Sequence, residues 1–396
     1  LKRHSAAPRV CREMAMPNLM KHLIVAWTVG TAIAAKTRLR PRSESVAGFE
    51  RSLPSFYHTS QELKDELQKV AENCPEMMLR TETASYAGRS VELDVVSIKG
   101  NGQPKNKAFL LFGEHARELI SAESGLHFVK TVCEQKDVLR NNEFMMVLNA
   151  NPGSRAKVEQ GDWCLRVNPN GVDLNRNWDE HWEGDASYGT DTNPGQGPFS
   201  EAETQLLKKL VSSYEPTTFL TIHSGTLGMY MPWAFDMQHL ADRNQESMMQ
   251  ILQKVDEDHC QCPFGAAGRE VGYSCPGTCL DWVFDKLKTP YAFAYEIYYG
   301  GSPDELRERW QEKVHLPGAS LIQAQSLAHP HFKDLYIQYP SSFIQVASQH
   351  HEENNALQGF ACFGMFNPDT EEKYRETVEN WSKAYLDTVE QVALKL

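Results

Sequence analysis

The sequence predicts an α/β fold, a single domain whose sheet is covered by helices on both faces. Short apolar runs of strand length alternate with segments whose apolar residues recur at three- and four-residue spacing, as on one face of a helix. Hydrophobic residues make up 41% of the 396 residues, enough for a substantial core. The length alone would suggest two or three domains, but no linker rich in glycine, serine or proline separates the motifs described below. We therefore expect one domain over residues 55–396.

The elements are predicted by apolar periodicity and by residues that favour helix starts. The first helix should be capped by Ser60 and carry Leu63, Leu67 and Val70 on one face. The expected elements that follow are a strand at 90–98, a strand at 108–112, a helix from Glu118 to about Cys133, strands at 144–148 and 219–222, a helix opened by the capping box Ser200-x-x-Glu203, a strand at 291–298 and a final helix from about Thr370.

An apolar run at 23–35 lies near the amino terminus and is too short to span a bilayer. The basic pair Lys21-His22 precedes it and the small residues Ala32-Ile33-Ala34 end it, a pattern typical of a secretory signal. A buried or amphipathic helix is the alternative. We expect residues 1–35 to be upstream residues and a signal peptide, the product to be secreted or to enter the endomembrane lumen, and no stable membrane insertion.

The formal net charge of −12 argues against nucleic acid or an anionic membrane as a partner. Separately, we expect the protein to be a monomer. Eight of the nine cysteines lie beyond the predicted signal, and an even number in an oxidising compartment favours disulfides. Cys260-x-Cys262 and Cys275-x-x-x-Cys279 could instead hold a second metal ion. The pairing stays open.

A histidine and a carboxylate three residues apart, His115 and Glu118, follow the apolar strand at 108–112. At a strand's exit both can turn toward one metal ion, and His223, at the end of another apolar run, is the expected third ligand. Two histidines and one glutamate leave a fourth position open, which is typical of a catalytic zinc site. Alone, His-x-x-Glu occurs often by chance, and the other interpretation is an exposed helix start with an acid in its first turn.

Three later segments strengthen the metal-site hypothesis: Arg166–Trp178, Gly272–Trp282 and Tyr291–Tyr298, the last a strand with one acid inside an aromatic run. Together with the three candidate ligands, in this order, they resemble the zinc metallocarboxypeptidases of the carboxypeptidase A/B type over roughly residues 56–396. The resemblance implies a mixed sheet of about eight strands with helices on both sides. It also implies one Zn²⁺ per chain and hydrolysis of the C-terminal peptide bond of peptides or proteins.

The resemblance assigns the catalytic roles. Glu296 would be the general base for the zinc-activated water, because burial in an aromatic strand disfavours the charged carboxylate and raises its pKa toward a useful value. The alternative is a carboxylate that points to solvent from an edge strand. Arg166 would stabilise the oxyanion, and Asp173 would orient the first zinc-binding histidine, His115.

The substrate contacts are also implied by resemblance. Asn175 and Arg176 match the family's clamp for the terminal carboxylate, which a planar guanidinium binds through two parallel hydrogen bonds. Tyr273 would close over the substrate, and Arg117 resembles a contact further along the cleft. Leu280 matches the floor of the specificity pocket, where an apolar side chain implies a preference for apolar or aromatic C-terminal residues.

The chain departs from the family pattern at three places. The expected linker at 36–54 is too short for the folded prosegment of digestive members. A polar stretch near 301–358 is longer than the family plan needs and should be a surface insertion. Gly225 stands where the family often has a tyrosine lining the next subsite.

Two other functions stay open. One is a metallo-amidase that acts on a non-standard peptide substrate. The other is a catalytically silent zinc-containing binding protein, but such proteins usually lose the base or the clamp, whereas Glu296, Asn175 and Arg176 are all in place.

Overall fold

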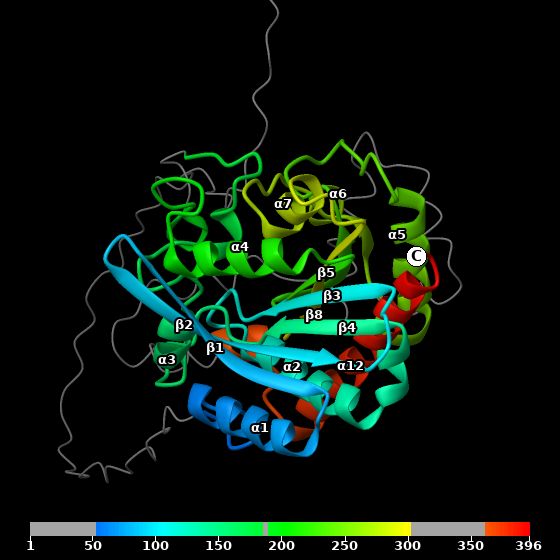
Figure 1. The fold of residues 1–396 in the computed structure, drawn as a ribbon. Coiled ribbons are helices and arrows are strands. Elements are labelled where there is room, and N and C mark those ends of the chain that lie inside the picture. The colour runs from blue at the N-terminus through cyan, green and yellow to red at the C-terminus, as the bar shows by residue number, and fades with distance from the viewer. Residues whose placement is uncertain (1–52, 185–188, 302–360) are drawn as a thin grey trace, which may run out of the picture.

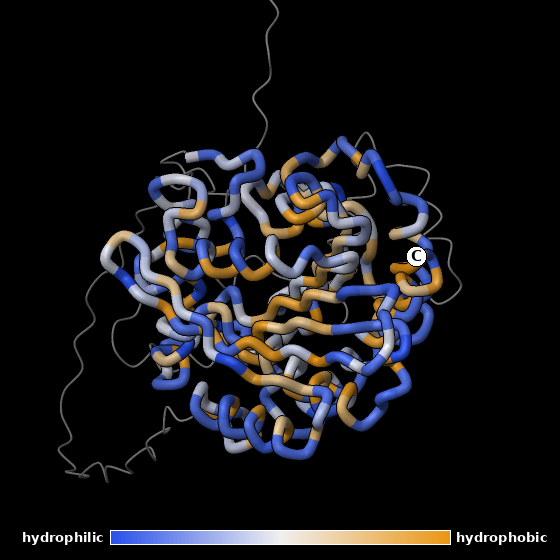
Figure 2. The backbone as a smooth tube through the Cα atoms, in the orientation of Figure 1, coloured by the Kyte–Doolittle hydropathy of each residue, from blue (hydrophilic) through white to orange (hydrophobic). Residues whose placement is uncertain are grey.

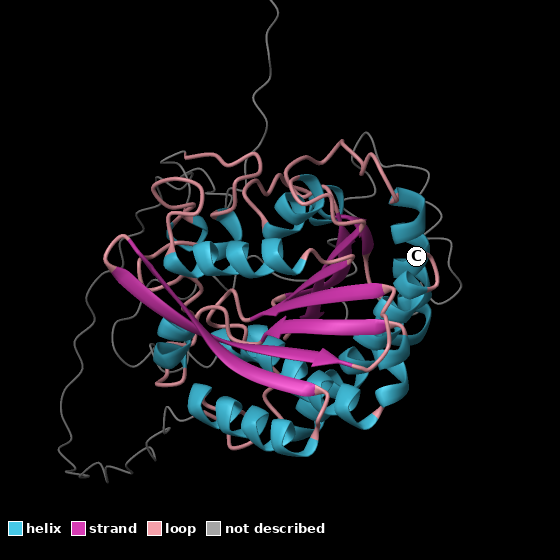
Figure 3. Cartoon of the chain, in the orientation of Figure 1, coloured by secondary structure: helices cyan, strands magenta, loops and turns pink. Residues whose placement is uncertain are grey.

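The computed structural model describes residues 53–184, 189–301 and 361–396. They form one mixed sheet of eight strands with helices on both faces, which confirms the predicted fold class (Figures 1 and 3). The predicted signal peptide at 1–35, and nearly all of the linker at 36–54 and of the insertion near 301–358, lie outside the described residues. None of the described helices is long and apolar enough to cross a membrane.

The sheet has the order β1-β2-β4-β3-β5-β8-β6-β7. Its strands are β1 Met77–Tyr86, β2 Arg89–Lys99, β3 Asn106–Phe112, β4 Asn142–Val147, β5 Thr218–His223, β6 Thr226–Met231, β7 Phe264–Ala266 and β8 Tyr291–Tyr298. The four central strands β4, β3, β5 and β8 are parallel, whereas β1, β2 and β4 pair antiparallel and β6 runs antiparallel to β8. The carboxyl ends of the parallel strands therefore meet at one edge, where ligand sites of such sheets usually form.

The helices cover the sheet in two layers. They are α1 Ser60–Asn73, α2 Leu119–Glu134, α3 Pro152–Val158, α4 Ala202–Tyr214, α5 Gln245–Val255, α6 Ala267–Val271, α7 Cys279–Asp285 and α12 Glu371–Ala393, with the short turns η1 Lys136–Arg140, η2 Leu174–Arg176, η3 Thr190–Thr192 and η4 Asp256–Cys260. Helices α1, α2 and α12 lie on one face of the sheet, and α4 and α7 lie on the other (Figure 1).

The core is built on the central strands, whose middle parts include hydrophobic residues (Figure 2). Phe112 of β3 and Phe128 of α2 both contact Tyr385 of α12, with ring centroids 5.9 Å and 5.5 Å apart. All three rings are fully buried, and each contributes about 1.5–3 kcal/mol through burial of apolar surface. This aromatic cluster holds α2 and α12 against the strand that leads into the candidate site.

The predicted cap of the first helix is wrong by one residue. Thr59, rather than Ser60, is the N-cap of α1, and its hydroxyl accepts the backbone N–H of Glu62 while the Glu62 carboxylate accepts the N–H of Thr59. Ser60 donates its hydroxyl to Glu159, 2.7 Å away, so a tertiary contact withdraws it from capping.

The predicted capping box at Ser200 is also wrong. Helix α4 begins at Ala202 after Glu201, and its N-cap makes no side-chain capping bond. The Ser200 hydroxyl instead donates to the Glu201 carboxylate at 2.8 Å and accepts from Nδ2 of Asn177 at 3.0 Å. A hydrogen bond to the adjacent Glu201 and one from the distant Asn177 therefore take the place of the predicted capping bond.

Within the described ranges, six cysteines form disulfides: Cys74–Cys133, Cys164–Cys362 and Cys260–Cys262. At Cys260 and Cys262, which share a bond with each other, this agrees with the preference for a disulfide over a second metal site, but at Cys275 and Cys279 the preference is not borne out. Cys275 and Cys279 are buried thiols.

Candidate metal centre and substrate site

The first two candidate ligands follow the carboxyl end of β3. Gly113 directly follows β3 with a φ of +70°, and a Cβ there would lie 3.0 Å from the backbone oxygen of Leu148. Glycine therefore allows a sharp turn toward His115 that a larger residue would strain. Glu118 is the N-cap of α2, but its side chain makes no capping bond. It is only 2% exposed, so the interpretation as an exposed helix start is wrong.

The third candidate ligand, His223, is the last residue of β5, the parallel neighbour of β3. Its Nδ1 lies 3.1 Å from Nδ1 of His115 and 3.1 Å from Oε2 of Glu118. Nδ1 of His115 lies 2.7 Å from Oε1 of Glu118. The structure thus gathers the three predicted ligands into one buried group whose donor atoms all lie within 4.8 Å of one another.

This donor set fits zinc. Zn²⁺ binds imidazole nitrogen and carboxylate oxygen at about 2.0–2.2 Å, so neighbouring donors of a tetrahedral site lie about 3.3 Å apart. The observed separations of 2.7, 3.1 and 3.1 Å are close to this value. Two nitrogen lone pairs that face each other repel, so the paired Nδ1 atoms of His115 and His223 need a proton or a metal cation between them.

Asp173 lies behind His115, as the resemblance implies. Its Oδ1 is 3.1 Å from Nε2 of His115, and its Oδ2 accepts from Nε and Nη2 of Arg166 at 3.0 and 2.9 Å. Burial would raise the pKa of Asp173, but the charges of Arg166 and His115 outweigh it and hold that pKa well below its usual range. Nη1 of Arg166 lies 3.6 Å from Oε1 of Glu118, so the guanidinium borders the ligand group.

Sequence reasoning missed Glu114, a carboxylate next to the first ligand that is only 1% exposed. Its Oε2 accepts from the Thr221 hydroxyl at 2.9 Å and from the Cys279 thiol at 3.3 Å, and lies 3.4 Å from Nε2 of His223. Burial lowers the pKa of His223, but hydrogen bonds to Glu114 and Glu118 outweigh it and raise that pKa to about 10. The available signal was a charged residue at the end of a buried strand.

Glu296 lies on β8, which pairs with β5 on one side and β6 on the other, so the alternative of an edge strand is wrong. It is the register partner of His223. Its Oε2 is buried without a hydrogen-bond partner among the described residues. Burial, together with the negative charge of Glu118, raises the pKa of Glu296 to about 8.

Asn175 and Arg176 come from η2 and face the loop that precedes α7. Nη2 of Arg176 donates to the Cys275 thiol at 3.4 Å, and Oδ1 of Asn175 accepts the N–H of Cys279 at 3.0 Å. A Cβ at Gly277, where φ is +73°, would lie only 2.3 Å from the backbone oxygen of Arg176, so glycine permits this close approach. Nδ2 of Asn175 is 3.4 Å from Nε2 of His223, which places the predicted clamp beside the predicted ligands.

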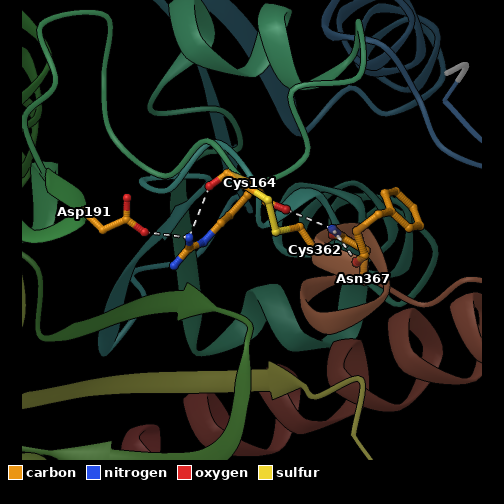
Figure 4. The surroundings of a disulfide bond; sticks show 6 residues. Cys164, Asp191, Cys362 and Asn367 are labelled. Carbon is orange, nitrogen blue, oxygen red and sulfur yellow. Dashed lines mark hydrogen bonds and ion pairs between the residues drawn. A yellow bond between two sulfur atoms is a disulfide. The ribbon is translucent and has the colours of Figure 1, made fainter. Parts of the chain in front are cut away.

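Arg117 is held by contacts within the protein. Its Nη1 donates to Asp191 at 2.9 Å and to the backbone oxygen of Cys164 at 3.2 Å, and its guanidinium lies over the ring of Phe366, 4.1 Å from the centroid. Its backbone oxygen accepts from Asn367. Figure 4 shows Asp191 and Asn367 on either side of the Cys164–Cys362 disulfide. Arg117 therefore joins the segments that contain Cys164, Asp191 and Asn367.

Leu280, the predicted pocket floor, and Tyr273, predicted to close over the substrate, have different surroundings. Leu280, the first-turn residue after Cys279 in α7, is 2% exposed and belongs to the core, whereas Tyr273 is 42% exposed. A Cβ at Gly225 would lie 2.3 Å from a ring carbon of Phe366. The Phe366 ring therefore occupies space that a tyrosine at position 225 would need.

The sheet and the group of three candidate ligands define the class of protein. It is an α/β protein with a candidate site for one zinc ion, of the kind that leaves a coordination position open. The family model of the zinc carboxypeptidases matches residues 63–316, well over half of the chain. The chain belongs to the zinc carboxypeptidase family.

Individual relatives are distant. Carboxypeptidase A1 from Sus scrofa is 24% identical over 272 residues, which cover 61% of this chain and 62% of the relative. A zinc carboxypeptidase from Simulium vittatum is 26% identical over 268 residues, which cover 61% of this chain and 85% of that protein. The chain thus spans less than two thirds of the length of the porcine relative.

Among solved structures, bovine thrombin-activatable fibrinolysis inhibitor in complex with tick carboxypeptidase inhibitor matches with a TM-score of 0.61 at 19% identity. The match covers 86% of this chain and 98% of that one. At this identity the similarity shows the fold alone.

Proposed function

We propose that this protein is a zinc-dependent metallocarboxypeptidase that hydrolyses the C-terminal peptide bond of peptides or proteins. One observation carries the proposal: His115, Glu118 and His223 converge at the carboxyl edge of the sheet, with Glu296 on the adjacent strand. Membership of the zinc carboxypeptidase family supports the same class of reaction.

The residues around the donor group have the chemistry that amide hydrolysis needs. When bound, zinc would polarise the substrate carbonyl and activate water at neutral pH. Glu296, with a pKa raised to about 8, would take a proton from that water and deliver it to the departing amine. Arg166 would stabilise the negative charge that develops on the carbonyl oxygen, and its two hydrogen bonds to Asp173 support its position.

The clamp pair would explain cleavage at a C-terminus. Arg176 is largely buried, and a buried guanidinium binds a carboxylate far better than a neutral peptide group. Asn175 would contribute a second polar contact, and the exposed Tyr273 would close over the bound terminus. An internal peptide bond offers no carboxylate at this position.

We also propose a preference for apolar or aromatic C-terminal residues, because the resemblance matches the apolar Leu280 to the floor of the family's specificity pocket and each buried methylene adds about 0.8 kcal/mol to binding. The remaining proposals are one Zn²⁺ per chain, a monomer, and secretion directed by the signal predicted at 1–35. The three disulfides suit an oxidising compartment.

A mixed pool of peptides, incubated with the purified protein and analysed by mass spectrometry, tests the proposal. We expect loss of single C-terminal residues, prevented by a zinc chelator and restored by added zinc. Cleavage confined to side-chain or other non-standard amides would favour the metallo-amidase instead. Stoichiometric zinc without any cleavage would favour the catalytically silent binding protein.

Two variants separate the base from the metal ligands. Glu296→Gln should retain zinc and lose turnover, whereas Glu118→Ala should lose both. Near-normal turnover by Glu296→Gln would show that the proposed base is wrong.

A further inference from the structure

Glu114 has no role in the mechanism above, although it is one of the most buried carboxylates in the described chain. It follows Gly113 and directly precedes His115, but its side chain turns toward β5 rather than toward the ligand donor atoms. There its Oε2 accepts the hydroxyl of Thr221 at 2.9 Å, and the same hydroxyl lies 2.8 Å from Nε2 of His223. Glu114, Thr221 and His223 therefore form a continuous chain of polar contacts.

The direction of these hydrogen bonds follows from the metal-facing atom. Nδ1 of His223 faces the other two ligands, at 3.1 Å from each, so Nδ1 must offer its lone pair to a metal ion. A neutral imidazole then carries its proton on Nε2, which can donate to the Thr221 oxygen. The Thr221 hydroxyl uses its own proton to donate to Glu114. Every donor in this series of hydrogen bonds thus has an acceptor.

The carboxylate is fixed from a second side by Cys279, the first residue of α7. The Cys279 thiol donates to Oε2 of Glu114 at 3.3 Å, and the Cys279 N–H donates to Oδ1 of Asn175 at 3.0 Å. Oε1 of Glu114 is buried with no hydrogen-bond partner among the described residues. Such a buried anion is costly unless positive charge lies close to it, and a cation bound at Nδ1 of His223 would supply that charge through the imidazole.

We propose that Glu114 is a positioning residue for His223, acting through the Thr221 hydroxyl, so that each of the two zinc-binding imidazoles has its own carboxylate behind it. Asp173 serves His115 at 3.1 Å, and Glu114 serves His223 through the bridge of 2.8 and 2.9 Å. The pair fixes the ring orientation and the tautomer of His223 and makes its Nδ1 a stronger donor. This inference rests on the proposed zinc site.

The test measures zinc affinity by competition with a chromogenic chelator, using the full chain. Glu114→Gln and Thr221→Val should each weaken zinc binding by about 10- to 100-fold, the usual effect of removing a partner of a ligating histidine. Thr221→Ser keeps the hydroxyl and should retain wild-type affinity, whereas valine keeps the shape of threonine and loses the hydroxyl. The double variant should bind zinc little more weakly than either single variant, because both changes interrupt the same series of hydrogen bonds from Glu114 to His223.

A spectroscopic readout separates positioning from a merely structural role. With Co²⁺ in place of zinc, the visible absorption bands should shift in Glu114→Gln and Thr221→Val and should match wild type in Thr221→Ser. Glu143→Gln, which changes a buried carboxylate on β4 that pairs with Lys99 at 2.9 Å, is the matched control and should leave both readouts unchanged.

The outcomes distinguish this inference from the proposed function. Wild-type protein that binds no zinc would overturn the proposed function itself. Wild-type affinity and an unshifted cobalt spectrum in both Glu114→Gln and Thr221→Val would overturn only the role of Glu114. If Glu114→Gln does not fold, the comparison of Thr221→Val with Thr221→Ser decides the question alone.

Discussion

Four carboxylates meet at the candidate metal centre, and their surroundings move their pKa values in opposite directions. Burial raises the pKa of all four, but in Glu114, Glu118 and Asp173 the neighbouring histidines or Arg166 outweigh burial and lower it. Glu296 keeps a raised pKa, because burial and the charge of Glu118 both favour its protonated form. Three acids are thus suited to hold a cation or orient its ligands, and the fourth is suited to exchange a proton.

The raised pKa of Glu296 predicts the acid limb of the pH profile. A carboxylate acts as a base only in its ionised form, which is present above its pKa and is lost as the pH falls through it. The positive charge of bound zinc would lower the pKa of Glu296 and so oppose the effect of burial. We therefore expect kcat/KM to fall toward acid with a midpoint above the ordinary value of 4.5 and no higher than about 8. A pH profile on one good peptide substrate measures it, and a midpoint at or below 4.5 would contradict the assignment.

Arg176 gives a second prediction at this scale. Arg176→Ala should lower kcat/KM for peptides with a free C-terminal carboxylate by at least about 30-fold, because losing one partner of a buried charge pair costs about 2–5 kcal/mol. The same peptides with an amidated C-terminus should be cleaved equally slowly by both proteins. Arg176→Lys should not restore the rate, since an ammonium lacks the planar fork. An unchanged ratio between free and amidated substrates would argue against the clamp.

At the scale of single residues, the sequence motifs pointed to side chains that the fold brings close together. The three candidate ligands, Asp173 and Glu296 all lie where the motifs suggested, gathered at one edge of the sheet. Glu114 was not found, because its partners Thr221 and Cys279 are 107 and 165 residues away in the chain. No local spacing connects residues whose contact depends on how β3, β5 and α7 pack together.

Helix α7 and the loop at 233–235 are joined by a single buried acid. Asp281 lies in the first turn of α7, is completely buried, and accepts the backbone N–H groups of Ala234 and Phe235 at 2.8–2.9 Å. Burial raises the pKa of Asp281 to about 7. The contact between α7 and the loop at 233–235 therefore depends on the protonation state of Asp281.

This raised pKa predicts a pH-dependent stability. The unfolded chain releases the Asp281 proton near its ordinary pKa of 3.8, whereas the folded protein holds it up to about 7. Stability should therefore fall as the pH rises through this window, by an amount on the order of a few kcal/mol. Asp281→Asn should match wild type near pH 4 and be more stable at pH 8, measured by denaturant unfolding at constant zinc. If the free energy of unfolding depends on pH in the same way for wild type and Asp281→Asn, the raised pKa of Asp281 is contradicted.

At the scale of elements, periodicity predicted the central strands and the long helices but not the edge of the sheet. Strand β3 is buried at six of its seven positions, whereas β1 is largely exposed, so its sequence lacks an apolar run. Both wrong caps, at Ser60 and Ser200, have the residue type that favours capping. Contacts with Glu159 and Asn177 occupy their hydroxyls instead, and such contacts are invisible in local sequence.

For the whole molecule, apolar periodicity indicated a sheet between two helical layers, but the strand order β1-β2-β4-β3-β5-β8-β6-β7 does not follow from it. The resemblance to a known family supplied the mixed sheet of about eight strands. Disulfide pairing also depended on the fold, because Cys164 and Cys362 are 198 residues apart and meet only when the carboxyl-terminal segment packs beside the site.

The metal centre should make a large contribution to the stability of the whole fold. Its three candidate ligands come from the end of β3, the start of α2 and the end of β5, so one ion would join three central elements. A ligand at 1,000 times its Kd stabilises the folded state by about 4 kcal/mol. Removing zinc with a chelator should therefore lower the Tm by several degrees, and added zinc should restore it. Glu118→Ala should abolish this dependence, while Glu296→Gln should keep it, since the base is not a ligand. A Tm that does not respond to zinc in protein shown to bind it would mean that these elements hold their positions without the ion.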